Sequence, residues 1–227
     1  IGIQHLVIIP FTRAFSELAS TEFIQNILID KICTHKLVIG YDHRFGKNRE
    51  GSFESLKQNC ESYGFEVEEI PRQDIEDLAI SSTRIRNALT SGDVTIAQEL
   101  LGRPYSITGT VVKGRQLGRT IGFPTANLHI HESYKLIPAN GVYVIQIHHK
   151  GDIYAGILNI GVRPTVDGTI RTIEAHIFDF NKDIYGEDIK LIFLKHLRDE
   201  QKFDGIDALT SQIKLDKAQA LAFFEKR

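Results

Sequence analysis

Several residue types are missing or scarce in the 227-residue sequence, beginning with methionine and tryptophan, of which it has none. The missing methionine and the start at Ile1 indicate a fragment without its natural start, or a sequence from which methionine positions are absent. The first residues lack the charged and apolar regions and the cleavage site of a signal peptide. No apolar run is long enough for a membrane-spanning helix, so we expect no membrane association.

Cysteine is scarce and the charge is nearly balanced. Cys33 and Cys60 are far apart and neither lies in a CxxC pair, so we expect buried free thiols rather than a disulfide or a metal site. This usage favours a reducing cytoplasm. The formal net charge of −2 argues against a broad nucleic-acid surface and favours small anionic ligands in a local site. The oligomeric state is not predicted by any of these features.

The first hundred residues alternate short apolar runs with segments of helical spacing. We expect strands at 5–11, 36–40 and 65–70, and helices at 21–32 and 54–63, the last of them ended by Gly64. Apolar runs without strict alternation, separated by helices, indicate a parallel sheet covered on both faces. This part is predicted to be α/β.

After Leu101 the pattern changes to β-rich segments separated by Gly, Asp, Asn and Pro, which is typical of a small antiparallel barrel or sandwich. An amphipathic helix is expected from about Asp207 to the end of the chain. Because Gly102 can end a helix and Pro104 prevents its resumption, we predict two domains, 1–103 and 104–227.

The stretch GFPTAN carries the first candidate site. Thr125 and Asn127 are two residues apart, so in an extended segment their oxygens point to one side, where they could be ligands of Mg²⁺. Pro124 would hold that geometry. Upstream, Gly114 lets backbone N–H groups approach phosphates, and Arg119 can neutralise them. The alternative is a turn at a barrel corner, where Pro and Asn are common.

A carboxylate lies in the later strand segment RTIEAHIFD. Strand alternation places Ile173 and Ala175 on one face, and Glu174 and His176 on the other. Glu174 could be a solvated outer residue. If its face borders a phosphate site, it is suited to act as the general base for a substrate hydroxyl.

The first part holds two further candidates. Ser81, Ser82 and Thr83 begin a helix that also carries Arg86, which predicts either a phosphate site or a plain serine cap. Asp42 directly follows a strand, where α/β sheets bind ligands, or is a turn residue.

The histidine pairs are weaker signals. His129 and His131 could face one side but lack a third metal ligand. His148 and His149 are expected to be a solvated strand end.

Several longer motifs follow one another in the order of a known family. They are GRTIGFPTANL, LNIGVRPT, IEAHIFDF, DIYG and LRDEQKF, and this series resembles riboflavin kinases. Upstream, VIGYDHRFGKNREG, ISSTRIRNALTSGDV and LLGRPYSITGTVVKG resemble the adenylyltransferase half of bacterial bifunctional riboflavin kinase/FAD synthetases. The resemblance covers essentially the whole chain.

The resemblance implies an enzyme that uses ATP and Mg²⁺ to convert riboflavin to FMN and, in complete form, adenylylates FMN to FAD. It implies a partial Rossmann-like α/β domain followed by a six-stranded antiparallel β-barrel with a C-terminal helix. It places Thr125 and Asn127 on Mg–ATP, Gly114 and Arg119 in the phosphate-covering loop, and Glu174 as the catalytic carboxylate. The other implied site residues are Tyr185 on the nucleotide side, Arg198, Gln201 and Phe203 on the flavin side, Ser82, Thr83 and Arg86 on the transferase nucleotide, and Asp42 on its flavin side.

One element of the family pattern is missing. The HxGH-type motif of the transferase half would lie before Ile1, so we expect the chain as it stands not to make FAD efficiently. Two alternatives remain: a riboflavin kinase with a degenerate transferase domain, and a non-catalytic flavin-binding regulatory module. Retention of Thr125, Asn127 and Glu174 argues against the second, because a binder needs no base.

Overall fold

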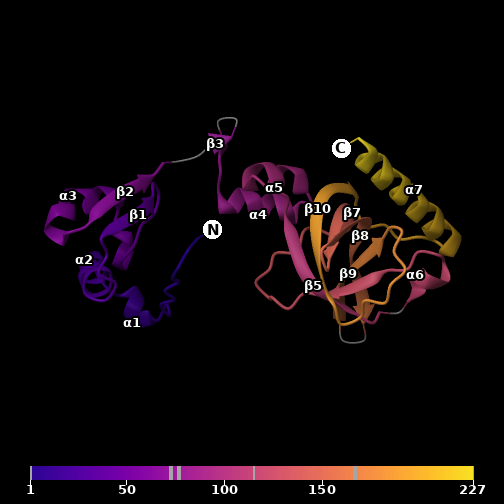
Figure 1. Cartoon of the computed structure of the whole chain (residues 1–227), viewed down its shortest axis with the longest axis horizontal. Helices are drawn as coiled ribbons and strands as arrows, with labels where there is room; N and C mark the ends of the chain where they lie inside the picture. Colours follow the sequence, from indigo (N-terminus) through magenta and orange to yellow (C-terminus); the bar gives the residue numbers. More distant parts are fainter. Residues whose placement is uncertain (1, 72–73, 76–77, 115, 166–167, 227) are drawn as a thin grey trace. The chain divides into compact units, whose positions relative to one another are not determined.

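The computed structural model describes residues 2–71, 74–75, 78–114, 116–165 and 168–226. These residues form two compact units, Ile1–Ala79 and Ile80–Arg227 (Figure 1). Within the described residues, no helix combines the length and the apolar character needed to cross a bilayer. Each unit has its own hydrophobic core.

The first unit is built around a two-stranded parallel sheet. Strands β1 (Lys36–Gly40) and β2 (Glu66–Ile70) pair in register and are joined by helix α3 (Phe53–Tyr63). Gly64 ends α3 in the left-handed conformation. The core gathers side chains from the sheet, from α3 and from the preceding helical segment, namely Ile24, Leu28, Ile39, Leu56 and Phe65. The parallel α/β prediction for β1, α3 and β2 is confirmed.

Short elements complete this unit. They are α1 (Arg13–Ser16), α2 (Ser20–Phe23), a π-helical segment (Ile24–Ile29), a 3₁₀ turn (Lys47–Arg49), and the small pair β3 (Asp74–Ile75) and β4 (Leu78–Ala79). The helix expected at 21–32 is therefore α2 followed by the π-helical segment, with its buried residues Ile24 and Leu28 facing the core.

Two predictions for this unit were wrong. The segment 5–11 is not a strand: Leu6, Ile8 and Phe11 are at least 80% exposed, and no neighbouring strand among the described residues supplies the hydrogen bonds that extended backbone requires. Cys33 is also exposed rather than buried, since it lies in the turn after the π-helical segment, while Cys60 is half-buried. Both are free thiols, as predicted.

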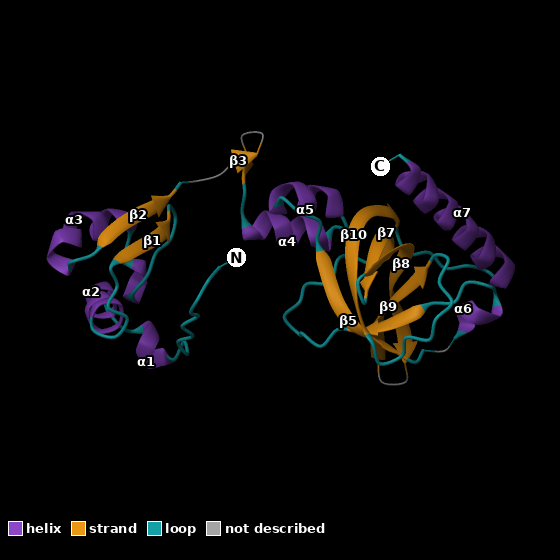
Figure 2. Ribbon diagram, in the orientation of Figure 1, coloured by secondary structure: helices purple, strands orange, loops and turns teal. Residues whose placement is uncertain are grey.

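The second unit is a closed antiparallel barrel with the strand order β10-β5-β6-β9-β8-β7, and the predicted six-stranded fold is confirmed (Figure 2). The strands are β5 (Ser106–Val112), β6 (Ala126–His129), β7 (Gly141–His149), β8 (Asp152–Thr165), β9 (Gly168–Ile177) and β10 (Asp188–Arg198). A short helix, α6 (Leu117–Thr120), lies in the β5–β6 connection. The interior is filled by fully buried side chains such as Tyr143, Leu158 and Phe193.

Two helices before the barrel pack onto it. Helices α4 (Ser82–Thr90) and α5 (Val94–Leu101) place Leu89 and Ala97 in the same core cluster as the barrel interior. The second compact unit therefore begins at Ile80, whereas the sequence placed a boundary at 103. Gly102 does end α5 in the left-handed conformation, but the apolar faces of the two helices are buried against the barrel.

The C-terminal helix α7 (Ile206–Glu225) covers part of the outer barrel face (Figure 2). Ile213 and Ala220 pack against Val142 and Ile157 in a second core cluster outside the barrel. The predicted C-terminal helix is confirmed. Its packing against β7 and β8 creates the wall of the pocket described next.

Candidate functional site

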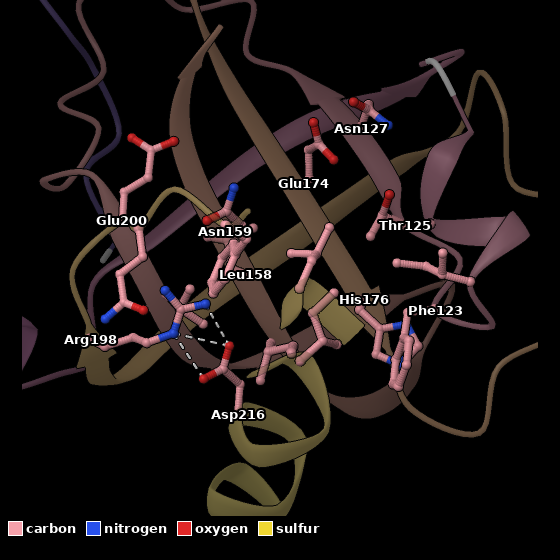
Figure 3. Close-up of a pocket in the computed structure, with 18 of the residues that line it drawn as sticks. Phe123, Thr125, Asn127, Leu158, Asn159, Glu174, His176, Arg198, Glu200 and Asp216 are labelled. Carbon is pink, nitrogen blue, oxygen red and sulfur yellow. Dashed lines mark hydrogen bonds and ion pairs between the residues drawn. The ribbon is translucent and has the colours of Figure 1, made fainter. Parts of the chain in front are cut away.

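Three polar side chains lie in one row across neighbouring strands. Asn127 of β6 is the register partner of Glu174 of β9, and Glu174 is the partner of Asn159 of β8. Register partners in antiparallel strands point to the same face, and all three line a single pocket between the barrel and α7 (Figure 3). The alternating residues Ile173 and Ala175 are buried in the barrel core. The predicted alternation of this strand is confirmed, and Glu174 faces a pocket.

Thr125 lies beside this row, directly before the first residue of β6. Its side chain and that of Asn127 line the same pocket, in which Figure 3 shows them near Glu174. Gly114 approaches Asn127 so closely that a Cβ atom added to it would lie 2.3 Å from the Asn127 Nδ2 atom. A side chain at 114 would therefore displace the amide of Asn127, and the stretch GFPTAN borders this pocket through Phe123, Thr125 and Asn127.

The carboxylate of Glu174 is paired with a guanidinium group. The Nη2 atom of Arg163 donates to Glu174 Oε1 at 2.8 Å, and both side chains are partly exposed. One carboxylate oxygen is thus engaged with Arg163. A carboxylate held in this way beside a hydroxyl and an amide is suited to accept a proton from a bound hydroxyl group.

The opposite side of the pocket is organised by a buried carboxylate on α7. Arg198 donates from Nε to Asp216 Oδ1 at 2.9 Å and from Nη2 to Asp216 Oδ2 at 2.8 Å, as the dashed lines in Figure 3 show. Gln212 donates to the same carboxylate. The Arg198 guanidinium also lies 5.7 Å from the centre of the Phe203 ring, and Gln201 completes this wall.

A second pocket adjoins the first at Thr125, which lines both. The second pocket is lined by Arg119 from the β5–β6 connection and by Tyr185 from the segment before β10. Gln116 donates to the Tyr185 hydroxyl at 3.3 Å, and so ties the two segments together. Two ligands bound in the two pockets would meet at Thr125.

His176 is buried in the wall beside this meeting point. It is 8% exposed, and its ring contacts those of Phe123 and Phe178 edge-on. Burial lowers the pKa of the imidazole below its usual value of 6.5. The hydrogen bond to the Pro124 carbonyl opposes this shift, and the nearby charge of Lys217 adds to it. The ring is therefore neutral at pH 7.

The residues predicted for the transferase reaction are not among those that line these two pockets. Ser82, Thr83 and Arg86 are exposed on the first turns of α4, and Ser81 is the N-cap, its hydroxyl accepting from the Arg84 N–H. Asp42 is exposed in the turn after β1. The serine cap is thus present, and the roles of the other residues stay predictions.

The other histidines hold no metal cluster in the part of the chain that the structure describes. His131 is hydrogen-bonded to Thr110, and its ring lies 4.8 Å from that of His129. The expected solvated strand end at 148–149 was wrong for His149. That ring is buried beside Phe180, and the Glu187 carboxylate, from the segment before β10, pairs with it.

Several residues that line this pocket were not singled out from the sequence. Among them are Asn159, Arg163, Glu200, Asp216 and, as a wall residue, His176. Asn159 and Arg163 belong to the motif LNIGVRPT, which was recognised in the sequence. Pairing this segment with the strand that carries Glu174 could have identified both residues, because the two strands are neighbours in the barrel. Asp216 had no such signal, because its importance depends on the packing of α7.

Family models match both parts of the chain. The model described as riboflavin kinase matches residues 101–224, and the model described as FAD synthetase matches residues 1–84. The first match contains the whole barrel and all of α7 except its last residue.

Curated relatives match nearly the full length of this chain. A protein of Haemophilus influenzae is 40% identical over 220 residues, covering 96% of this chain and 71% of the relative. One of Listeria monocytogenes is 38% identical, covering 100% of this chain and 71% of the relative. Both are named bifunctional riboflavin kinase/FMN adenylyltransferase.

A solved structure has the same fold. The crystal structure of a Streptococcus pneumoniae protein, titled macrolide-efflux protein, is 38% identical with a TM-score of 0.83. The match covers 92% of this chain and 66% of that one.

Proposed function

The chain belongs to the bifunctional riboflavin kinase/FMN adenylyltransferase family, and we propose that its barrel transfers the γ-phosphoryl group of ATP to the 5′-hydroxyl of riboflavin. It is an enzyme of flavin cofactor biosynthesis. The observation that carries the proposal is the row Asn127, Glu174 and Asn159, which lies beside Thr125 where two pockets meet.

Glu174 is the base in this proposal. Its carboxylate accepts the proton of the riboflavin 5′-hydroxyl while the hydroxyl oxygen attacks the γ-phosphorus and ADP leaves. Arg163 holds one carboxylate oxygen at 2.8 Å, which fixes the group and leaves the other oxygen for the proton. A general base of this kind contributes about 10²–10⁴-fold to the rate.

Thr125 and Asn127 fit a Mg²⁺ site. Both offer neutral oxygens, and Gly114 leaves the amide of Asn127 its place beside the β5–β6 connection. Mg²⁺ commonly keeps waters and takes one or two protein ligands together with substrate phosphates, so a cage of several carboxylates is not required. When bound, the ion would neutralise charge on the phosphate oxygens of ATP.

The two pockets divide the substrates. The pocket lined by Arg119 and Tyr185 takes the nucleotide, with the guanidinium near its phosphates. The pocket between the barrel and α7 takes riboflavin, with Arg198, Gln201 and Phe203 on its outer wall. The shared Thr125 places the reacting groups next to each other, which is what an in-line phosphoryl transfer requires.

The N-terminal part is proposed to serve the second reaction, the adenylylation of FMN to FAD. Its match to FAD synthetase over residues 1–84 supports this and includes Ser82 and Thr83, proposed for the nucleotide, and Asp42, proposed for the flavin side. Arg86, two residues beyond the match, is proposed for the nucleotide because it lies on the same helix as Ser82 and Thr83. Formation of FAD from FMN and ATP tests this activity.

The division between residues 103 and 104 is likewise proposed as the functional boundary, supported by a kinase match that begins at 101. Two free thiols support a cytoplasmic location.

The kinase proposal is tested by incubating the chain with riboflavin, ATP and Mg²⁺ and separating the flavins by chromatography. We expect FMN, and we expect Glu174→Gln to lower kcat by about 10²–10⁴-fold while the fold is retained. Glu132→Gln, in an exposed loop, is the matched control. Riboflavin binding without any FMN would instead support a flavin-binding module, and a Glu174→Gln variant at the wild-type rate would remove Glu174 from its role.

A further inference from the structure

His176 lies two residues after Glu174 and on the same side of β9, so its ring joins the pocket wall rather than the barrel interior (Figure 3). Edge-on contacts with Phe123 at 5.4 Å and Phe178 at 5.6 Å surround it with aromatic rings. A side chain packed in this way has little freedom to change its orientation.

Among the described residues, the ring makes one hydrogen bond, to the backbone of the site. His176 Nδ1 lies 2.8 Å from the carbonyl oxygen of Pro124. A carbonyl oxygen only accepts, so the proton of the neutral ring is on Nδ1. Nε2 is buried and has no hydrogen-bond partner among the described residues. The geometry therefore selects one tautomer.

The carbonyl that accepts this bond belongs to the peptide group joining Pro124 to Thr125. Because a peptide group is planar, fixing the direction of its oxygen also fixes the direction of the Thr125 N–H and Cα. On the other side of Thr125, Ala126 is held by pairing with Ala175 of β9. Thr125 is thus fixed from both sides, once by the sheet and once by the imidazole.

We propose that His176 is a positioning residue of the kinase site, whose Nδ1–H holds the Pro124–Thr125 peptide so that the Thr125 hydroxyl faces the junction of the two pockets. The inference rests on the proposed kinase function. A displacement of about 1 Å in a reacting arrangement can cost about 10²-fold in rate, so a single backbone anchor has a measurable effect.

The neutral state of the ring agrees with this role. A protonated imidazole would bury a charge beside Lys217 and leave the Nε2–H without an acceptor among the described residues. Lys217 itself lies over the Phe178 ring, on the α7 side of the cluster. The ring therefore acts as a hydrogen-bond donor in the wall and not as an acid.

Two substitutions separate the hydrogen bond from the packing. His176→Phe keeps an aromatic ring and removes the donor, whereas His176→Asn places an amide N–H near the position of Nδ1. We expect His176→Phe to lower kcat/KM for Mg–ATP by about 10–100-fold, with riboflavin affinity from flavin fluorescence changed less than about threefold. We expect His176→Asn to recover most of the loss. The control is His129→Phe, an exposed position on β6.

The outcomes are distinguishable. If His176→Phe keeps the wild-type kcat/KM, or if both variants lose activity and riboflavin affinity equally, the positioning role is wrong and His176 only packs. A readout independent of activity is the ¹⁵N spectrum of the His176 ring, where we expect a protonated Nδ1 and a bare Nε2. The opposite tautomer would overturn the inference. Absence of FMN formation by the wild-type chain would contradict the kinase function itself, not the tautomer.

Discussion

Replacing Asp216 by alanine tests how the pocket is supported from α7. Asp216 is 2% exposed and accepts from Arg198 Nε and Nη2 and from Gln212 Nε2. Its removal leaves the Arg198 guanidinium, whose side chain is 17% exposed, without its counter-charge. The variant therefore measures how much an unpaired charge in a nearly buried position lowers the unfolding free energy.

The size of the effect follows from that burial. Breaking a buried ion pair by removing one partner costs about 3–5 kcal/mol in unfolding free energy. Because some water reaches Arg198, we expect the lower end, about 3 kcal/mol. For a domain of this size each kcal/mol lowers the melting temperature by about 2–4 °C, so the expected shift is about 6–12 °C.

The assay is thermal unfolding followed by circular dichroism, together with riboflavin affinity from flavin fluorescence. We expect affinity to fall in Asp216→Ala, because Arg198 also holds the Phe203 ring and the Asp199 carbonyl. The matched control is Asp207→Ala, an exposed carboxylate in the first turn of α7, for which about 0.3–1 kcal/mol is expected.

A loss below about 1 kcal/mol for Asp216→Ala would refute the reasoning, because it would mean that water or another group compensates Arg198. A double replacement sharpens the test. Arg198→Met combined with Asp216→Leu removes both charges, and such replacements are often neutral for stability. We expect the double variant to be more stable than Asp216→Ala while binding riboflavin weakly. Equal destabilisation in both would show that packing, not charge, is responsible.

Two further predictions concern the loop and the core. Gly114→Ala should displace the Asn127 amide, since its Cβ would lie 2.3 Å from Nδ2, and should therefore lower kcat/KM for Mg–ATP by about tenfold or more. Gly205→Ala, whose Cβ meets open space, is the control and should leave kcat/KM unchanged. Equal kinetics in the two variants would contradict the expected displacement of Asn127. Burial raises the pKa of Tyr143 to about 12 from its ordinary value of 10, so the protonated phenol stabilises the fold below pH 10 and that contribution is lost as the pH rises toward 12. The urea midpoint of the wild type should therefore fall more steeply over this interval than that of Tyr143→Phe, and parallel curves would count against it.

The sequence was most informative where periodicity and burial coincide. In β9 the alternation of Ile173, Glu174 and Ala175 placed the carboxylate on the outer face, and the structure has it there. The helix ended by Gly64 was equally predictable, because a left-handed residue at that point favours glycine. Local rules were sufficient in both cases.

Predictions from the sequence failed where contacts between residues far apart in the chain determine the local structure or burial. The apolar segment 5–11 has strand character but no partner strand among the described residues, so its pattern alone could not determine its state. His149 was expected at a solvated strand end, yet its ring is buried and pairs with Glu187, 38 positions away. Asp216 is one of many carboxylates in the sequence, and only its contact with Arg198 distinguishes it.

The register of β6, β9 and β8 has a consequence for how the pocket can change. Asn127, Glu174 and Asn159 share a face only because each lies opposite its partner. Inserting or deleting a single residue in β9 would turn Glu174 toward the barrel interior and its neighbours Ile173 and Ala175 outward. Divergence or engineering of this site must therefore proceed by substitution within the strands, and changes in length are confined to the connections between them.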